Sequence, residues 1–187
     1  MNKIVVKGST LGDSLVGGDQ YNFNIHIPPS DPTVITRGLE HFQKLAQDDE
    51  DFQDFLDRLN FYVNQKNNAP VIGLEKKLMN GGRADLVTDA VERKDAFAKR
   101  LLKSQLNTRR QWIYLYVLQK ISFAFEGLVR PLIKKGATGD AIDSTIYYGI
   151  VSNIYNEVVG IDSTIDQYTI SGMVYFLTGK CHLIWEP

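Results

Sequence analysis

The chain has 187 residues, of which 43% are hydrophobic and 23% charged, and it contains one cysteine. This is the composition of an ordinary folded domain, and it excludes disordered, collagen-like and disulfide-stapled proteins. Charge is unevenly distributed along the chain, because residues 1–70 carry a net charge of −4, residues 71–135 a net charge of +8 and residues 136–187 a net charge of −5.

Residues 1–30 differ from the rest of the chain because they carry β-strand signals. The segment Tyr21–Ile27 alternates apolar and polar residues, which is typical of a strand with one buried face. A short strand or hairpin is marginally stable alone, so we expect its apolar face to pack on the helices or on a neighbouring chain. The predicted oligomer or partner interface consists of Tyr21, Phe23, Ile25 and Ile27.

From Asp31 onward, apolar residues recur at the spacing of amphipathic helices. Asp31 is predicted to cap the first helix, with Pro32 at its first position. The helix over about residues 108–128 is apolar nearly all round, so we expect it at the centre of the core. Charged residues interrupt this apolar stretch, which favours a buried helix over a membrane span. Other predicted helices cover about residues 51–63, 71–79, 84–103 and 142–158.

The end of the chain combines a short helix with strand-prone residues. Thr169 is predicted to cap this helix and Gly179 to end it in the left-handed conformation. Cys181–Trp185 is predicted to form a closing strand, with Trp185 burying a large area. The predicted fold is mainly α, a helical bundle with a short N-terminal β-hairpin or strand arm and a short C-terminal strand. Its expected parts are the arm at 1–30, a helical segment at 31–80 and a helical C-terminal domain at 84–187, and the packing of the second part on the third is left open.

No catalytic or metal-binding motif is found in the sequence. His26, His41 and His182 are isolated from one another, and side chains of adjacent strand residues such as Cys181 and His182 point to opposite faces. We therefore predict no catalytic site, no metal and no cofactor, and a hydrolase with Cys181 as nucleophile is the remaining enzymatic alternative. The N-terminus carries neither a secretory signal nor a lipidation motif, so we expect a cytoplasmic protein with no membrane partner.

The basic segment 71–135 is the candidate nucleic-acid contact. Clustered Lys and Arg side chains neutralise phosphates, and such binding weakens steeply with salt. Helical spacing spreads these charges around the helix axis, and no aromatic residue is interleaved with them as a stacking platform. Internal or solvated charges are therefore favoured over nucleic-acid binding. The candidate residues are Arg93, Lys94, Arg100, Lys103, Arg109 and Arg110.

The string GMVYFLTGKCHLIW, from Gly172 to Trp185, resembles the terminal signature of a known family. It is similar to the C-terminal domains of bacterial ABC-three-component conflict systems, the Lamassu-type anti-phage defence systems, over about residues 90–187. The resemblance implies a non-catalytic domain that usually follows an effector such as a nuclease or protease. It also implies an SMC-like ABC ATPase and a small middle component as partners. The signature residues, which we expect to be structural, are Gly172, Tyr175, Gly179, Cys181, His182 and Trp185.

The leading hypothesis is a non-enzymatic helical assembly domain that forms a homo-oligomer and docks an SMC-like ABC ATPase in a bacterial anti-phage defence complex. The alternative is a nucleic-acid-binding module that uses residues 71–135. The sequence contains no recognisable effector domain before the family-like part. Any toxic activity is therefore expected to be absent, to be supplied by another chain, or to belong to a longer protein of which this is a piece.

Overall fold

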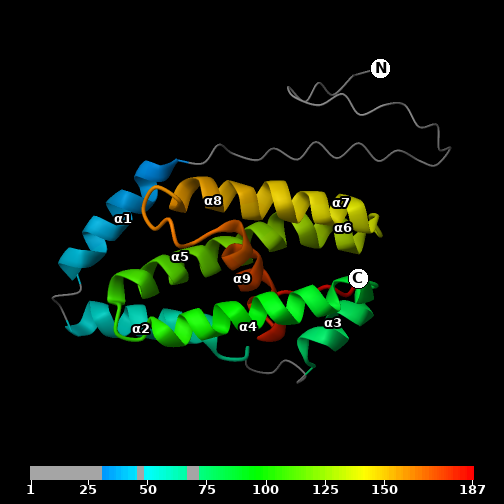
Figure 1. Ribbon diagram of the computed structural model, residues 1–187, viewed down its shortest axis with the longest axis horizontal. Coiled ribbons are helices and arrows are strands. Elements are labelled where there is room, and N and C mark those ends of the chain that lie inside the picture. Colours follow the sequence, from blue (N-terminus) through cyan, green and yellow to red (C-terminus); the bar gives the residue numbers. More distant parts are fainter. Residues whose placement is uncertain (1–30, 46–48, 67–71) are drawn as a thin grey trace, which may run out of the picture.

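The computed structural model describes residues 31–45, 49–66 and 72–187, and all regular structure in these ranges is helical (Figure 1). The prediction of a mainly α protein is therefore confirmed. The predicted N-terminal arm, with Tyr21, Phe23, Ile25 and Ile27, lies outside the described residues. In chain order the elements are α1 (Pro32–Leu45), α2 (Asp49–Val63), α3 (Leu74–Asn80), η1 (Ala84–Leu86), α4 (Val87–Lys103), α5 (Thr108–Ala124), η2 (Phe125–Val129), α6 (Arg130–Lys134), α7 (Gly139–Ser144), η3 (Thr145–Ser152), α8 (Asn153–Val158) and α9 (Gln167–Gly179).

Two long helical rods form a hairpin at the centre of the molecule. The elements α5, η2 and α6 follow one another without a break, as do α7, η3 and α8, and the two rods lie side by side (Figure 1). Glu157 of α8 is 3% exposed, accepts a hydrogen bond from the Tyr116 hydroxyl at 3.0 Å and pairs with Lys120 of α5. The predicted central helix is thus confirmed as part of the core. Among the described helices, none is both long and apolar enough to cross a bilayer.

The segments η2 and η3 are π-helical and contact each other across the hairpin. The sequence predicted ordinary α-helix over both, because a π-helical turn has no characteristic residue pattern. In a π-helical turn each backbone hydrogen bond joins residues five apart, one more than in an α-helix, so the turn is wider. Such turns frequently occur at functional positions. The exposed residues of η3 are therefore candidates for function.

The N-terminal helical segment packs on this hairpin, which answers the question that the sequence left open. Helix α1 contacts α5 and α8, and α2 contacts α5. The Phe42 ring lies 6.0 Å from the Trp112 ring of α5 and 4.7 Å from the Phe55 ring of α2, centroid to centroid. The Asp31 carboxylate accepts a hydrogen bond from the backbone N–H of Thr33 at 2.9 Å, so the predicted cap of α1 is confirmed.

Helix α9 lies against α4, and the two backbones touch at Gly172. A Cβ atom at this position would lie 2.4 Å from the backbone oxygen of Arg93, so only glycine allows this approach. The prediction that Thr169 caps α9 is wrong, because Asp166 is the cap. Its carboxylate accepts hydrogen bonds from the backbone N–H of Thr169 at 2.8 Å and from the Thr169 hydroxyl at 2.6 Å. A carboxylate three residues before the donor N–H is well placed to satisfy it.

The prediction of a strand over Cys181–Trp185 is wrong, because this segment is an irregular tail. Within the described ranges no strand lies beside it, so it has no partner for a β-ladder. Its apolar side chains instead close the helical core. Leu183 is 1% exposed and Trp185 is 2% exposed, so the predicted burial of the tryptophan is confirmed.

The turn after α9 uses a cysteine where the sequence predicted a glycine. The backbone N–H of Cys181 donates to the carbonyl of Thr178 at 3.1 Å, and that of His182 donates to the carbonyl of Leu177 at 2.9 Å. This is the hydrogen-bond pattern of a Schellman motif, which requires one residue in the left-handed conformation. That residue is Cys181, with φ of 66°, while Gly179 is the last residue of the helix. The prediction for Gly179 is therefore wrong by two positions.

Candidate interaction surface

Trp185 and Gly172, from the C-terminal signature, lie inside the fold. The Trp185 indole N–H donates to the Thr178 hydroxyl at 2.9 Å, and its ring lies 5.4 Å from the ring of Phe125. The tail approaches closely at Gly81, where a Cβ atom would lie 2.8 Å from the backbone oxygen of Trp185. Gly172 has no side-chain carbon, so α9 approaches α4 closely at this position. These two signature residues therefore contact the protein's own core.

Two further signature residues, Cys181 and Tyr175, are buried or half-buried. Cys181 is 7% exposed, and its sulfur accepts a hydrogen bond from the side-chain amide of Gln65 at 3.5 Å. Tyr175 is half-buried, and burial raises the pKa of its hydroxyl. Among the described residues, no three His, Cys, Asp or Glu side chains are grouped to hold a metal ion.

His182 connects the tail to the end of α2. The side chain is buried, its Nε2 atom lies 3.1 Å from the backbone oxygen of Asn64, and its ring contacts those of Phe61 and Tyr62 at 5.1 and 5.4 Å. Burial disfavours the charged imidazolium and lowers the pKa of His182 from its ordinary value of 6.5. The folded protein therefore holds this side chain neutral at a pH where the unfolded chain binds a proton.

This difference makes stability depend on pH in one direction. The contribution of the neutral His182 is fully present above the unfolded pKa, near 6.5, and is lost as the pH falls through the lower folded pKa. We expect acidification from pH 7.5 to pH 5 to lower the melting temperature of the wild type more than that of His182→Gln, as measured by circular dichroism. His41→Gln changes an exposed histidine of α1 and should leave the wild-type pH dependence intact. Parallel curves for the wild type and His182→Gln would contradict the prediction.

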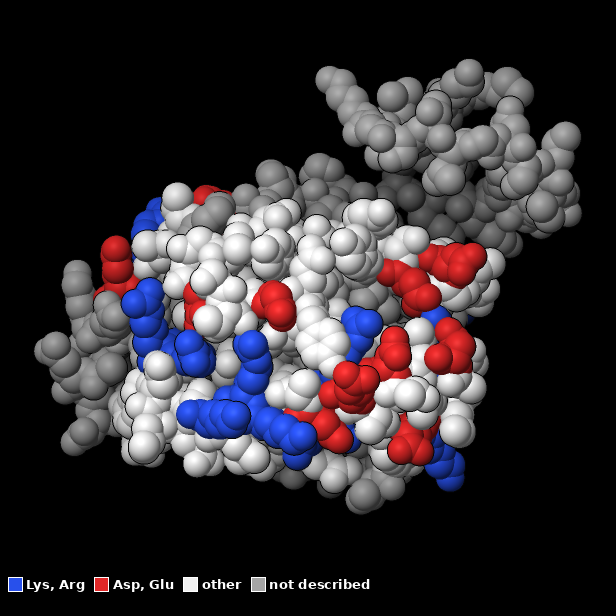
Figure 2. Space-filling view, viewed as in Figure 1, with Lys and Arg blue, Asp and Glu red and all other residues white. Residues whose placement is uncertain are grey.

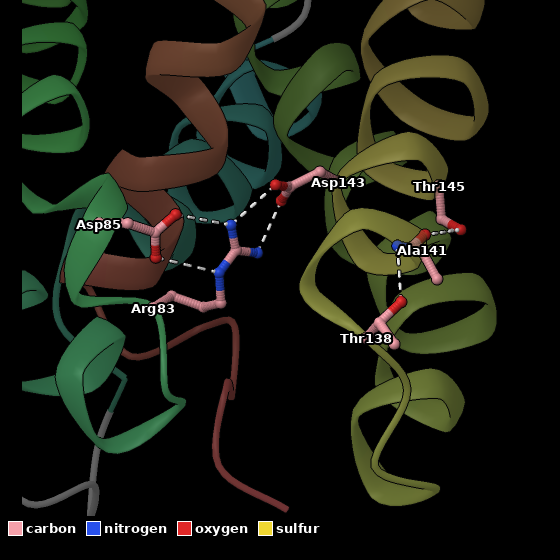
Figure 3. A network of polar contacts seen from close by, with 6 residues as sticks. All are labelled: Arg83, Asp85, Thr138, Ala141, Asp143 and Thr145. Carbon is pink, nitrogen blue, oxygen red and sulfur yellow. Dashed lines mark hydrogen bonds and ion pairs between the residues drawn. The ribbon is translucent and has the colours of Figure 1, made fainter. Parts of the chain in front are cut away.

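A buried arginine joins the start of η1 to α7. The Arg83 side chain is 7% exposed, and its two terminal nitrogens donate to the two carboxylate oxygens of Asp143 at 2.6 and 2.7 Å. Figure 3 shows the guanidinium between this carboxylate and that of Asp85, which accepts at 3.2 and 3.4 Å. The hydrogen bonds that Arg83 donates to Asp143 are the main cause that raises the pKa of Arg83, and the hydrogen bonds that it donates to Asp85 lower the pKa of that carboxyl. Arg83 and Asp85 are therefore both held in their charged forms.

Exposed tyrosines lie beyond Asp143 along the same rod. Tyr147 and Tyr148 of η3 are 45% and 63% exposed, and their rings meet edge to face at 4.9 Å. The Tyr147 hydroxyl donates to the Gln167 side-chain oxygen at 3.5 Å, at the start of α9. Tyr168 follows, 40% exposed. We call these four residues, Tyr147, Tyr148, Gln167 and Tyr168, the tyrosine surface.

The tyrosine surface continues onto α4. The Tyr168 hydroxyl donates to the Glu92 carboxylate at 3.1 Å, and the Arg93 guanidinium lies over the Tyr168 ring at 5.3 Å. Three elements distant in sequence, η3, α9 and α4, are thus connected through side chains that remain open to solvent. Tyrosine and arginine are enriched at protein–protein interfaces because they bury a large area and still form hydrogen bonds. Sequence reasoning missed this surface, because its four residues come together only through the packing of α9.

The candidate nucleic-acid residues are divided between internal contacts and solvent. Arg93 pairs with Asp89 at 3.6 Å, Lys94 with Asp95 at 3.2 Å and Arg110 with Asp162 at 3.2 Å. Arg100 donates to the backbone oxygen of Thr164 at 2.5 Å. Within the described ranges, Lys103 and Arg109 form no ion pair. These remaining cations lie at the junction of α4 and α5.

An aromatic cavity of about 400 Å³ lies between α1, α2 and α5. Its apolar lining includes Phe42, Trp112 and Tyr116, and polar groups such as His41 and Arg58 surround them. The Trp112 ring is stacked against the rings of Phe42, at 6.0 Å, and Tyr116, at 5.8 Å. The aromatic residues of this cavity therefore pack on one another.

The described chain is an all-helical domain in which the C-terminal signature contacts the core and tyrosines and charges line the outside. Residues 73–185, more than half of the chain, match the family of C-terminal domain 9 of the ABC-three component (ABC-3C) systems. The chain belongs to this family, and it is thus a component of an anti-phage-type system. The resemblance seen in the signature is confirmed, and the matched region begins earlier than predicted, at α3. No curated protein and no solved structure gives a significant match to the chain.

Proposed function

We propose that this chain is a non-catalytic docking domain that holds the SMC-like ABC ATPase of its three-component system. The observation that carries the proposal is the tyrosine surface, with its exposed rings on a rigid helical frame. Family membership supports the presence of partner components. The proposal assigns the binding energy to Tyr147 and Tyr148, because they are the most exposed aromatic pair described on this face.

The geometry of this pair suits a protein partner. A tyrosine has few rotatable bonds, so it presents a large contact area at a low cost in conformational entropy. The Tyr147 ring is fixed by its contact with Tyr148 and by the hydrogen bond to Gln167, which reduces that cost further.

The internal ion pairs weigh against the nucleic-acid alternative. Four of its six candidate side chains already contact an aspartate or a backbone oxygen within the domain, so they are only partly available to phosphates. The carboxylates that pair with them would also repel a phosphate backbone. A protein partner therefore fits this face better than a nucleic acid.

Replacing both tyrosines tests the docking role. We expect Tyr147→Ala combined with Tyr148→Ala to weaken binding of the purified ABC ATPase of the same system at least about 30-fold, because truncating an interface hot spot costs about 2 kcal/mol or more. Biolayer interferometry measures this, and the loss should lie mainly in the dissociation rate. Phe123→Ala removes another aromatic side chain, 78% exposed on α5, and should leave affinity within about threefold. Equal effects of the two changes would argue against a specific surface.

A further inference from the structure

One face of α4 carries exposed side chains in both halves of the helix and is divided by charge. Residues spaced three or four apart on a helix share one face. Asp89 and Glu92 lie on this face in the N-terminal half, followed by Lys99, Leu102 and Lys103 in the C-terminal half. Figure 2 shows the corresponding division, with Asp and Glu over the N-terminal half of α4 and Lys and Arg over its C-terminal half. We call this face the α4 stripe.

We propose that two copies of this chain associate through the α4 stripe, with their α4 helices antiparallel about a two-fold axis near Ala96. In that arrangement Glu92 of one copy faces Lys99 of the other, and Asp89 faces Lys103. The midpoint between positions 92 and 99 and the midpoint between positions 89 and 103 both fall next to Ala96. A single two-fold axis at that point therefore brings both pairs together. A two-fold axis repeats every contact, which gives four complementary charge pairs and a closed dimer.

The charges of the α4 stripe are available for such pairing. Within the described residues, Lys99 and Lys103 form no ion pair. The Asp89 carboxylate is 69% exposed, and its contact with Arg93 is loose at 3.6 Å. Asp95 lies near the proposed axis, where two copies would bring like charges together, but it pairs with Lys94 of its own chain at 3.2 Å. Its charge is therefore partly compensated at the position where repulsion would be greatest.

Apolar side chains at the basic end supply the affinity that surface charges alone do not. Exposed ion pairs contribute little to net stability, although they fix the orientation of partners. Leu102 is 65% exposed and Leu106, in the turn after α4, is fully exposed. The antiparallel arrangement places both leucines over the acidic end of the other copy. Tyr168 lies at that end, 40% exposed and in contact with Glu92, and offers its ring as an apolar surface.

The divided charge selects a second copy over other occupants. A nucleic acid would be attracted to the basic half and repelled by the acidic half. A uniformly charged protein segment would meet the same conflict. A matching partner must place basic side chains over the acidic half of the stripe and acidic side chains over its basic half. An antiparallel copy of the α4 stripe does both. The docking role rests on Tyr147 and Tyr148, and the dimer shares only Tyr168 of the tyrosine surface with it.

Charge reversal with rescue tests the α4 dimer. One variant of the full chain combines Asp89→Lys with Glu92→Lys, which makes the stripe basic, and the other combines Lys99→Glu with Lys103→Glu, which makes it acidic. By size-exclusion chromatography with light scattering, we expect the wild type at twice the chain mass of 21.2 kDa and each variant alone at that mass. An equimolar mixture of the two variants should regain the doubled mass, because opposite stripes then meet. Circular dichroism checks that both variants retain the helical fold.

Three results would overturn the proposal. The first is a wild type that stays at the mass of one chain at concentrations up to about 100 µM, including one that binds DNA at low salt. The second is a dimer that persists in both variants and on deletion of residues 1–30. The third is a dimer that persists in both variants and is lost on that deletion, which would assign the contact to the N-terminal arm. Failure of the α4 dimer leaves ATPase binding through Tyr147 and Tyr148 unaffected, so the two proposals are distinguishable.

Discussion

Gly172→Ala is expected to destabilise the protein by about 3 kcal/mol, which lowers the melting temperature by about 6–12 °C. The added methyl group would lie 2.4 Å from the backbone oxygen of Arg93 and 3.2 Å from the Cβ atom of Phe97. Neither neighbour is the flexible end of a side chain, so α9 and α4 must move apart. Since these helices form a large part of the core, their separation also weakens the packing of neighbouring side chains between α4 and α9. Thermal and urea unfolding measure the effect.

Gly179→Ala provides the matched control on the same helix. A Cβ atom there would lie 3.5 Å from the Lys94 side chain, which is ordinary contact. Alanine is also favoured over glycine in helices, so we expect unchanged or slightly increased stability. Both glycines belong to the signature, and the sequence gives no reason to separate them. A Gly172→Ala variant as stable as Gly179→Ala would contradict the close contact of the two backbones.

Trp185→Ala is expected to cost about 3–5 kcal/mol, the range for removal of a large aromatic side chain from a core. The ring is 2% exposed, packs on Phe125 and donates its N–H to Thr178 within the core. Its loss leaves a cavity and an unpaired buried hydroxyl acceptor. We expect a strong fall in the urea midpoint, and exchange of the amide hydrogens of α9 should become faster because the tail no longer covers that helix.

Two further variants keep this prediction testable if Trp185→Ala fails to fold. Trp185→Phe retains an aromatic ring and loses the hydrogen bond to Thr178, so its cost should be intermediate, about 1–3 kcal/mol. Ile184→Ala changes the neighbouring side chain, which is 46% exposed, and should shift stability by no more than about 0.5 kcal/mol. Similar costs at positions 184 and 185 would show that the tail is not anchored through the tryptophan.

The helices could be predicted from the sequence because their signals are local. Asp31 followed by Pro32 marks the start of α1, and the cap at Asp31 is observed. The apolar spacing from Ile142 to Val158 reports one continuous rod, which the structure shows as α7, η3 and α8. The π-helical character of its middle was not predictable, because a π-helical turn has no characteristic residue pattern.

The end of α9 shows why local signals also mislead. The residues from Cys181 to Trp185 are strand-prone, but a strand needs a neighbour to supply hydrogen bonds, and none is present within the described ranges. Glycine is the usual left-handed residue after a helix, yet Cys181 adopts that conformation here. The tertiary contacts of the buried tail outweigh this local preference.

The exposed surfaces could be predicted only in part from the sequence. The order of acidic and then basic residues along α4 is visible in the sequence, and helical spacing places several of them on one face. Arg100 contacts Thr164 and Arg110 contacts Asp162, each more than fifty positions away, and only the fold reveals these partners. The tyrosine surface depends in the same way on where α9 lies against α4.

The close contact between Gly81 and Trp185 bears on how this domain is combined with other sequences. Helix α3 opens the family region and the tail closes it, and the side chains of Asn80 and Glu186 meet there at 2.7 Å. The tail therefore reaches the C-terminal end of α3, and the family region begins at the other end of this seven-residue helix, about 10 Å away. A unit whose two ends lie this close can be fused behind different sequences without stretching its core, because the fusion adds little requirement on the distance between its ends. Such modularity is a physical precondition for sharing one C-terminal domain among many proteins.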